Sequence, residues 1–443
     1  MTRFTRLARR GPAVLAGAAV LALTLGACSA APAPSDPDAP VVLDVWGWNP
    51  DEASAPGYFD AFEAENEGIT VNYRFIQYSD YVNATRLAAT TKDGPDVFGL
   101  QAGVLPEQFA PLTEDLAPYM SELVGSDWDS QLQATDQFEI DGKQVAVPWF
   151  MVTAGFMWAN QTVVDELGLS IPTTLEELKA FNAAAEAAGK TGLVVGAKDG
   201  WQNLDLFQVI ANQIEPGAFY DAMEGTTDFD SAVFVEAFEA WKALFDERVI
   251  PEGALGVTAY PDANDARLKG EAALIGFGSS QYRDTTNGRM AQYAETYGDP
   301  AIADTRFMPY PFPALVEGGT TGSLFGGPDV GWAVSAQSEQ KDAAAKLVAW
   351  LTTSETGVGL LGDALRPAAL KGSALNLSDV KTPEQVTAVE GFVSASETIV
   401  GPREIANADV KEALINALSG VAAGTTDPKD AAQAVQAVLS AAQ

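Results

Sequence analysis

With 443 residues, the chain exceeds what one hydrophobic core usually holds, so two domains are expected. Its 47% hydrophobic and 19% charged residues are typical of a globular protein and exclude a disordered chain. A formal net charge of -34 argues against nucleic-acid binding, and the absence of histidine excludes His-based catalytic triads and His zinc sites.

The first 27 residues are typical of a targeting segment. Arginines precede an apolar run over residues 13–25, which is too short to span a membrane and has the length of a signal core. The run ends in LGAC, which resembles the bacterial lipobox, and its Cys28 is the only cysteine, so no intramolecular disulfide can form. We expect a signal peptide over 1–27, lipidation of Cys28 rather than a buried thiol, and a Pro/Ala-rich tether over 28–40.

The elements after the tether alternate between strands and helices. Residues 41–46 predict a buried strand, residues 56–67 a helix, and residues 69–76 a second strand with alternating apolar positions. A helix to about residue 91 and a turn at 94–95 lead into a third strand. This order predicts an α/β fold with helices on both faces of a sheet.

Residues 145–160 contain an apolar strand interrupted by Pro148. Because proline cannot donate a hydrogen bond inside a central ladder, we expect the strand to end there, at a crossing between domains. Trp149 and Phe150 would then line a hinge that faces ligand, with a core seam as the alternative. The run at 156–160 predicts the next strand.

The second half of the chain continues the alternation. Thr174 and Glu177 form a predicted capping box at a helix start. The aromatic stripe through Trp241 has helical spacing and predicts core, as do Trp158 and Trp350. The remaining predictions are strands at 192–197, 271–278 and 329–335, a second crossing at 307–313 where prolines alternate, a helix at 340–352, and a helical tail beyond about 382.

The order of several motifs resembles the extracellular solute-binding lipoproteins of ABC importers, family 1, the sugar-binding and maltodextrin-binding-protein-like type. The resemblance covers nearly the whole mature chain. Two departures bear on the ligand: residues 278–282 lack a tryptophan that often stacks on sugar, and Met157 and Trp158 replace the usual tyrosines. The motifs are the lipobox, 94–97 (GPDV), 145–148 with 156–160, 164–178, 269–274 (KGEAAL) and 329–335 with the following helix.

The resemblance implies a two-lobed periplasmic-binding-protein-like fold of type II, whose lobes close on ligand between hinge strands. The expected first lobe is 41–148 plus 310–355, and the second is 149–309 plus 356–443. The implied function is capture of a mono- or oligosaccharide outside the membrane and delivery to ABC permease subunits, without enzymatic activity, cofactor or metal. The expected protein is a monomer, lipid-anchored to the outer face of the cytoplasmic membrane.

Ligands of open α/β sheets bind beyond the carboxyl ends of strands. A sugar presents C–H faces to aromatic rings and hydroxyls to carboxylates, amides and arginine. Trp201 lies in a polar turn after a strand, Arg366 is a lone cation, and Trp332 suits core or site equally. The other candidates follow predicted strand ends: Trp46, Trp48, Asn49, Tyr78, Gln101, Trp149, Phe150, Phe277, Ser279, Tyr310 and Asp329.

Two alternatives remain at this stage. The same fold could bind a non-sugar solute such as a peptide or polyamine, and the acidity of the chain would suit a cation. A secreted glycoside hydrolase would need two carboxylates, but 60 acidic residues guarantee that some pair lies close, and no stretch indicates an acid with a raised pKa.

Overall fold

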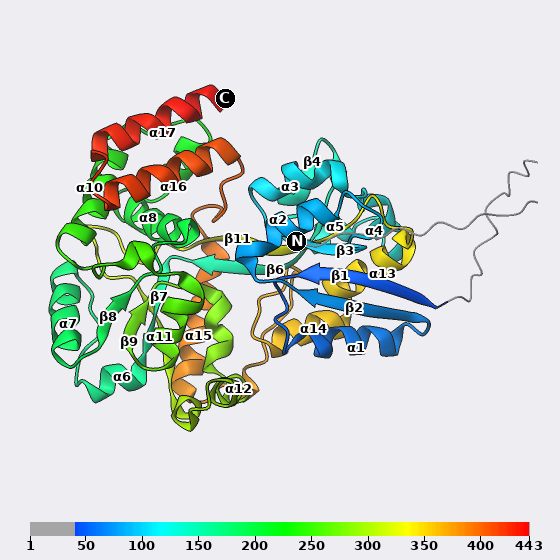
Figure 1. The fold of residues 1–443 in the computed structure, drawn as a ribbon, viewed down its shortest axis with the longest axis horizontal. Coiled ribbons are helices and arrows are strands. Elements are labelled where there is room, and N and C mark those ends of the chain that lie inside the picture. Colours follow the sequence, from blue (N-terminus) through cyan, green and yellow to red (C-terminus); the bar gives the residue numbers. More distant parts are fainter. Residues whose placement is uncertain (1–39, 443) are drawn as a thin grey trace, which may run out of the picture. The chain divides into compact units, whose positions relative to one another are not determined.

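The computed structural model describes residues 40–442. The predicted signal peptide, Cys28 and all of the predicted tether except Pro40 therefore lie outside the described residues. The described chain is built on two main β-sheets, each with helices packed on it (Figure 1). Large hydrophobic clusters belong to each sheet, so the prediction of two α/β lobes is confirmed.

The first lobe contains a five-stranded sheet made of β1 (Val41–Gly47), β2 (Ile69–Phe75), β3 (Val97–Leu100), β6 (Val147–Ala154) and β11 (Phe325–Val334). The strand order is β2-β1-β3-β11-β6. β1 is parallel to β2 and β3, whereas β11 is antiparallel to β3 and β6. Buried positions alternate in β1, which turns Leu43 and Val45 into the core. A short hairpin of β4 (Glu139–Ile140) and β5 (Lys143–Gln144) stands apart from this sheet.

The second lobe contains the strands β7 (Phe156–Asn160), β8 (Thr191–Val194), β9 (Ala272–Ile275) and β10 (Phe307–Pro311), in the order β10-β7-β9-β8. The strand predicted at 156–160 is confirmed as β7. The crossing predicted at 307–313 is wrong, because β10 pairs along its whole length with β7. β10 is an edge strand, where prolines are tolerated since one side of the backbone needs no partner in the sheet.

The first crossing between the sheets also differs from the prediction. β6 continues through Pro148 to Ala154, and Pro148 lies opposite Gly331 of β11 at the edge of the first sheet. The chain changes sheets at Gly155, whose φ is 100°. A Cβ at Gly155 would lie 2.5 Å from the carbonyl oxygen of Ser323, so the crossing requires glycine.

The helices lie on both sheets, and the predicted start of the second lobe's last segment at residue 356 is wrong. Helix Glu355–Asp363 (α14) packs on α1 and α13 of the first lobe, although residues from 356 onward were predicted to belong to the second. The helices are α1 (Ala55–Glu65), α2 (Tyr78–Ala88), α3 (Val104–Phe109), α4 (Ala117–Leu123), α5 (Trp128–Gln131), α6 (Gln161–Glu166), α7 (Leu175–Ala187), α8 (Gly200–Ile214), α9 (Ala218–Met223), α10 (Ala232–Asp246), α11 (Asn264–Leu268), α12 (Asn287–Tyr297), α13 (Lys341–Thr353), α14, α15 (Pro383–Ala395), α16 (Ala408–Ala422) and α17 (Pro428–Ala442).

The tryptophans predicted to be core are buried. Trp158, Trp241 and Trp350 have exposed fractions of 0%, 0% and 8%, and Trp332 is also fully buried, which settles its assignment as core. At α7, Thr174 accepts a hydrogen bond from the backbone N–H of Glu177, as the predicted capping box requires. The Glu177 carboxylate, however, accepts from the N–H of Thr173 rather than from Thr174.

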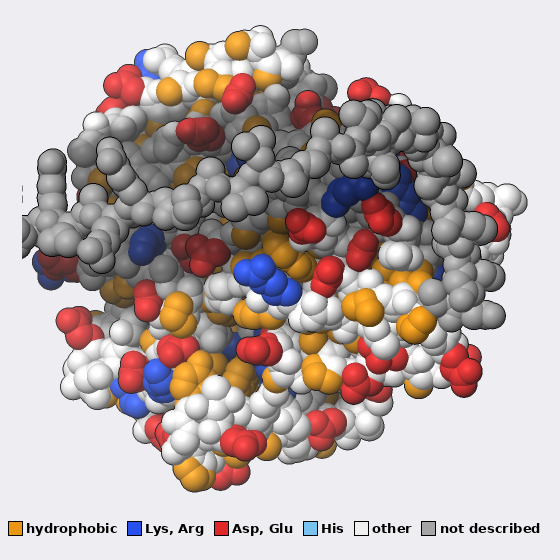
Figure 2. Space-filling view, turned by 45° about the vertical axis from the view of Figure 1, so that its right-hand side comes forward, with side chains coloured by type: hydrophobic (Ala, Val, Ile, Leu, Met, Phe, Trp, Pro, Cys, Tyr) orange, Lys and Arg blue, Asp and Glu red, His pale blue; other side chains and the backbone are white. Residues whose placement is uncertain are grey.

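Acidic side chains are distributed over the visible face of the molecule rather than gathered in one patch (Figure 2). Charges spread in this way are typical of a solvating surface. Within residues 40–442, no helix is long and apolar enough to cross a membrane.

Candidate functional site

The loop that follows β1 brings the two lobes into contact. Trp48 packs edge-on against Tyr78, with ring centroids 5.2 Å apart. The next residue, Asn49, accepts a hydrogen bond of 2.9 Å from Nη2 of Arg366. The Asp51 carboxylate bridges to the second lobe by 3.0 Å and 2.9 Å contacts to Arg283 and Arg289.

The charge of Asp51 is stabilised by these two arginines. Burial opposes ionisation, but the charges of Arg283 and Arg289 outweigh it and hold the pKa of Asp51 well below its usual range. Arg283 lies in the 3₁₀ segment Ser279–Thr285 that follows β9, and Arg289 lies on α12. The loop after β1 therefore contacts the second lobe through a fully ionised carboxylate.

A second polar chain starts in the first lobe and runs toward the tail of the protein. The Tyr78 hydroxyl donates to Oε1 of Gln101 over 2.5 Å, and Nε2 of Gln101 donates to Oδ1 of Asp329 over 3.3 Å. Nη1 of Arg403 lies 4.0 Å from the same Asp329 oxygen. Three residues predicted from strand ends and a helix start, Tyr78, Gln101 and Asp329, are thus brought together by the fold.

Burial raises the pKa of Asp329, and the nearby charges of Arg403 and Arg366 only partly oppose the effect. When it is protonated, such an aspartate carries no charge. It can then donate a hydrogen bond to a sugar hydroxyl or accept one from it at small electrostatic cost. Its place on β11, between Gln101 and Arg403, orients the carboxyl group toward the second lobe's cation.

Arg403 ties the first sheet to the second lobe. Its guanidinium holds Asp205 of α8 in a two-point contact, with Nε 2.9 Å from Oδ1 and Nη2 3.0 Å from Oδ2. It also donates to Glu404, and its backbone N–H donates to the carbonyl of Gly326 in β11. Burial disfavours the charged guanidinium, yet Asp205 and Glu404 raise the pKa of Arg403 above its usual value.

Aromatic rings of the second lobe stand next to Arg403. The Arg403 Cζ lies 5.6 Å from the centroid of Trp201, at the start of α8. Trp201, Tyr260 and Phe277 stack in near-parallel planes, with Tyr260 and Phe277 5.1 Å apart. These three rings are called the aromatic wall. Tyr260 is 37% exposed as a residue, whereas Phe277 is buried, so a ligand can reach the wall at Tyr260.

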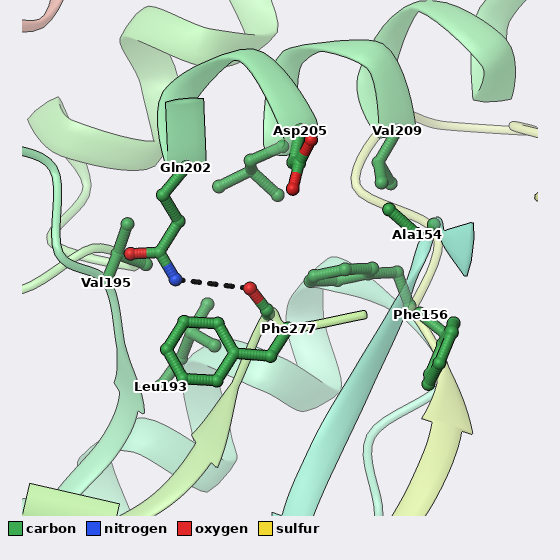
Figure 3. Close-up of a pocket in the computed structure, with 12 residues that line it drawn as sticks. Ala154, Phe156, Leu193, Val195, Gln202, Asp205, Val209 and Phe277 are labelled. Atoms are coloured by element: carbon green, nitrogen blue, oxygen red, sulfur yellow. Dashed lines mark hydrogen bonds between the residues drawn. The ribbon is translucent and has the colours of Figure 1, made fainter. Parts of the chain in front are cut away.

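A small cavity lies beside the aromatic wall (Figure 3). Asp205 and Val209 approach it from α8, Phe277 closes it from β9's end, and Nε2 of Gln202 donates to the carbonyl of Gly276 across 3.1 Å. Its volume of about 20 Å³ has room for an ordered water and not for a sugar ring. The space for a ligand must therefore lie outside it, where Tyr260 is exposed.

The predicted candidates divide into two groups. The structure brings nine of the predicted residues into the inter-lobe contacts described above or next to them. One of them, Phe150, is buried and supports Arg366: its ring centroid lies 4.6 Å from Cζ of that arginine. These nine are Trp48, Asn49, Tyr78, Gln101, Phe150, Trp201, Phe277, Asp329 and Arg366.

The prediction that Trp149 faces ligand is wrong. Its ring is fully buried between Tyr58 and Trp332, with centroids 5.3 Å and 5.4 Å away, inside the first-lobe core. The reason is the continuation of β6 past Pro148, which turns Trp149 toward the helix-covered face of the sheet rather than into a hinge.

Three further predicted residues have structural contacts elsewhere. Trp46 lies under the Arg74 guanidinium and packs against the core around Phe98. Ser279 is buried, and its hydroxyl accepts from the backbone N–H of Thr153. Tyr310 donates to Gln161 beside α6, at the edge strand of the second sheet.

Sequence reasoning missed several residues that complete the inter-lobe contacts. For the three arginines among them the signal was scarcity, since the chain has 26 basic residues against 60 acidic ones; the acidic residues and the tyrosine had no such signal. The missed residues are Asp51, Asp205, Tyr260, Arg283, Arg289, Arg403 and Glu404.

Metal chemistry has no candidate in the described part of the chain. Over residues 40–442, no group of three or more His, Cys, Asp or Glu side chains is placed to hold a metal ion. The carboxylates near the cleft are instead held by arginines.

Comparison with known proteins places this geometry in a family. The family model of bacterial extracellular solute-binding proteins matches residues 46–358. A multiple sugar-binding protein of Streptococcus mutans is 23% identical over 354 residues, which cover 79% of this chain and 80% of that protein.

Solved structures of low sequence identity share the fold. A chain from work on xylan utilisation by Caldanaerobius polysaccharolyticus has a TM-score of 0.73 at 20% identity, over 90% of this chain and all of the other. Maltose-bound MalE3 of T. maritima has a TM-score of 0.68 at 20% identity, over 91% of this chain and all of the other. The family match spans more than two thirds of the residues, so this chain belongs to the bacterial extracellular solute-binding proteins.

Proposed function

We propose that this protein is the carbohydrate-binding receptor of an ABC importer. The observation that carries the proposal is the aromatic wall of Trp201, Tyr260 and Phe277, which stands beside the polar chain that ends at Asp329 and Arg403. Aromatic faces suit the C–H faces of a sugar ring, and amides, carboxyls and guanidinium groups suit its hydroxyls. The named relatives that bind sugars support the same ligand class.

The proposed mechanism is binding followed by closure of the lobes. A ligand that touches the aromatic wall of the second lobe and Gln101 or Asp329 of the first gains contacts from both lobes only when they are together. Such a ligand shifts the population toward the closed arrangement by its differential affinity. No covalent step is involved, and the loaded receptor then delivers its sugar to permease subunits.

Export and anchoring complete the proposal. The signal peptide over 1–27, lipidation at Cys28 and the tether to residue 40 would hold the receptor, as a monomer, on the outer face of the cytoplasmic membrane. Palmitate labelling of the expressed protein, with Cys28→Ser as the control, tests this part: label that persists in the variant would contradict the anchor.

A sugar screen tests the ligand class. We expect a matching mono- or oligosaccharide to raise the melting temperature, since a 100-fold excess over Kd stabilises the folded state by about 2.7 kcal/mol. The sugar should change tryptophan fluorescence and be recovered unaltered by chromatography. Release of reducing ends would favour the hydrolase alternative, and a response to polyamines or peptides instead of carbohydrates would replace the ligand class.

Trp201→Ala locates the site within that screen. Loss of the stacking surface should weaken sugar binding about 10- to 100-fold. The matched control is Tyr119→Ala, an aromatic truncation on α4 of the first lobe that should leave affinity unchanged. Equal effects of the two variants would place the sugar away from the aromatic wall.

A further inference from the structure

Three buried arginines of the described chain differ in how their charge is balanced. Arg267 pairs with Asp284, and Arg403 pairs with Asp205 and Glu404. Arg366 keeps only 6% of its surface exposed, yet within residues 40–442 no carboxylate lies within ion-pair distance of it. A buried charge without a counter-ion is expensive, so its position calls for a reason.

The neighbours of Arg366 hold it in place but leave most of its donors unused. Nη2 donates to Oδ1 of Asn49 over 2.9 Å, and the ring centroid of Phe150 lies 4.6 Å from Cζ. The aromatic contact occupies no donor. A guanidinium has five N–H groups in a planar fork, a geometry that matches a carboxylate at two points.

The side chain lines a polar cavity of about 400 Å³ between the lobes. That volume falls in the range of small-molecule sites and is twenty times that of the cavity beside Phe277. The charged side chains that line the cavity are Asp51, Arg283, Arg289, Asp363, Arg366 and Asp379.

Each carboxylate of this cavity accepts hydrogen bonds from groups other than Arg366, and only Asp51 is paired with cations. Asp51 is held by Arg283 and Arg289, and Asp363 accepts from the side-chain amide of Asn376. Asp379, which also lines the cavity, accepts from the backbone N–H of Gly288 at the start of α12. Among the three arginines that line the cavity, Arg366 is therefore the one with no carboxylate of the described chain within ion-pair distance.

We propose that this cavity receives the carboxylate of an acidic saccharide, a uronic acid unit, with the Arg366 guanidinium as its counter-ion. The inference rests on the proposed sugar-binding function and names the class of sugar. Burial, together with the like charge of Arg283, lowers the pKa of Arg366 to about 10, so the group stays cationic at neutral pH and the attraction of a bound anion would offset the cost of its desolvation.

Because the net charge of the chain is -34, an anionic ligand needs a short-range attraction to bind. An anionic ligand is repelled at long range by an acidic protein, and only a desolvated cation at short range can outweigh that repulsion. Neutral sugars lack this contact. The receptor should therefore distinguish a uronate from its neutral counterpart through Arg366.

The test compares acid and neutral forms of one sugar on the full-length protein by isothermal titration calorimetry. The ligands are galacturonate and glucuronate oligosaccharides, their methyl esters and the corresponding galactose and glucose oligosaccharides. We expect the acid to bind about 10- to 100-fold more tightly than its methyl ester, as a charge-assisted contact requires. Arg366→Gln should abolish that ratio, so that the acid and its ester bind within about threefold of each other.

Two variants control for structure. Arg366→Lys keeps the charge but loses the fork, so it should retain part of the ratio, and Arg306→Gln removes an exposed arginine paired with Asp165 outside the cavity and should retain all of it. Circular dichroism and melting curves check that each variant folds.

The outcomes separate the two proposals. If neutral sugars bind and uronates bind no better, or if the ratio survives Arg366→Gln, the acidic-sugar inference is wrong and the proposed function stands. If neither form of any sugar binds, both fail. Preference for glucose 6-phosphate or a sulfated sugar over the uronate would overturn the assignment of a carboxylate.

Discussion

Arg403 and Arg366 stand in similar surroundings but have opposite charge balance. Each lies against an aromatic ring, Trp201 at 5.6 Å and Phe150 at 4.6 Å. Arg403 is surrounded by carboxylates of its own chain, whereas within residues 40–442 Arg366 has an amide as its hydrogen-bond partner. A cation whose charge is already matched holds structure together, and one whose charge is not matched is available to a ligand.

Trp149→Ala should have the largest effect on stability. It tests the core packing that supports Phe150, the ring against which Arg366 lies. Trp149 packs on Phe150 at 5.3 Å, and its loss leaves a large cavity in the first-lobe core. We expect about 3–5 kcal/mol less free energy of unfolding by urea denaturation. Weakened sugar binding at unchanged stability would instead return Trp149 to the ligand site.

Arg403→Met tests the matched side of the comparison. Removing the guanidinium leaves the largely buried Asp205 and Asp329 without their cation, while Glu404 keeps its 2.7 Å contact with Lys411. Leaving charges uncompensated should lower the free energy of unfolding by about 3 kcal/mol at pH 7. Arg306→Met, which breaks only an exposed ion pair, should change it by less than about 0.5 kcal/mol. Similar values for both variants would show that the Arg403 cluster is not structural.

Asp51→Asn tests how much the ion pairs between the lobes contribute to stability. The partly buried carboxylate pairs with two arginines, so we expect a loss of about 1–2 kcal/mol at pH 7. The folded-state pKa lies below the unfolded value, so this stability is present above pH 4–5 (approximately the unfolded range) and is lost as pH falls toward the folded value. The difference between wild type and variant should therefore shrink from pH 7 to pH 3, and a constant difference would contradict the ionic contribution.

Arg366→Gln should change stability least. Because no carboxylate of the described chain lies within ion-pair distance of Arg366, removing its charge removes the cost of desolvation while sacrificing the contact with Asn49. We expect a net change below about 1 kcal/mol in either direction at pH 7. A loss as large as that of Arg403→Met would make Arg366 a structural cation and remove the contrast between the two regions.

The first strands of the first lobe could be predicted because the apolar patterns that indicate them involve residues close together in the sequence. Alternating apolar residues at 69–76 and the apolar run at 41–46 predict strands that the structure confirms as β2 and β1. Thr174 caps its predicted helix for the same reason, since a cap needs only the next turn of backbone. The order of such motifs also indicated the family before any geometry was known.

Pro148 shows where local reasoning stops. A proline excludes a central strand, but only the neighbours in space decide whether a position is central. β6 is the last strand of its sheet, next to β11, and the backbone hydrogen bonds on its other side, to Pro367 and Ala369, involve Met151 and Trp149 rather than Pro148. That single fact moved the crossing to Gly155 and placed Trp149 in the core. The same ambiguity made the prolines of β10 look like a crossing when they lie on an edge.

Composition, periodicity and motif order were enough for the class of the chain, its two lobes and its family, because each depends on neighbours along the sequence. The partners of the cations needed the tertiary structure. Arg403 meets Asp205 from 198 residues away, and Asp51 meets Arg283 across 232. Charge balance depends on distances between groups that are remote in the chain, so only the folded molecule decides that Arg403 is matched and Arg366 is not.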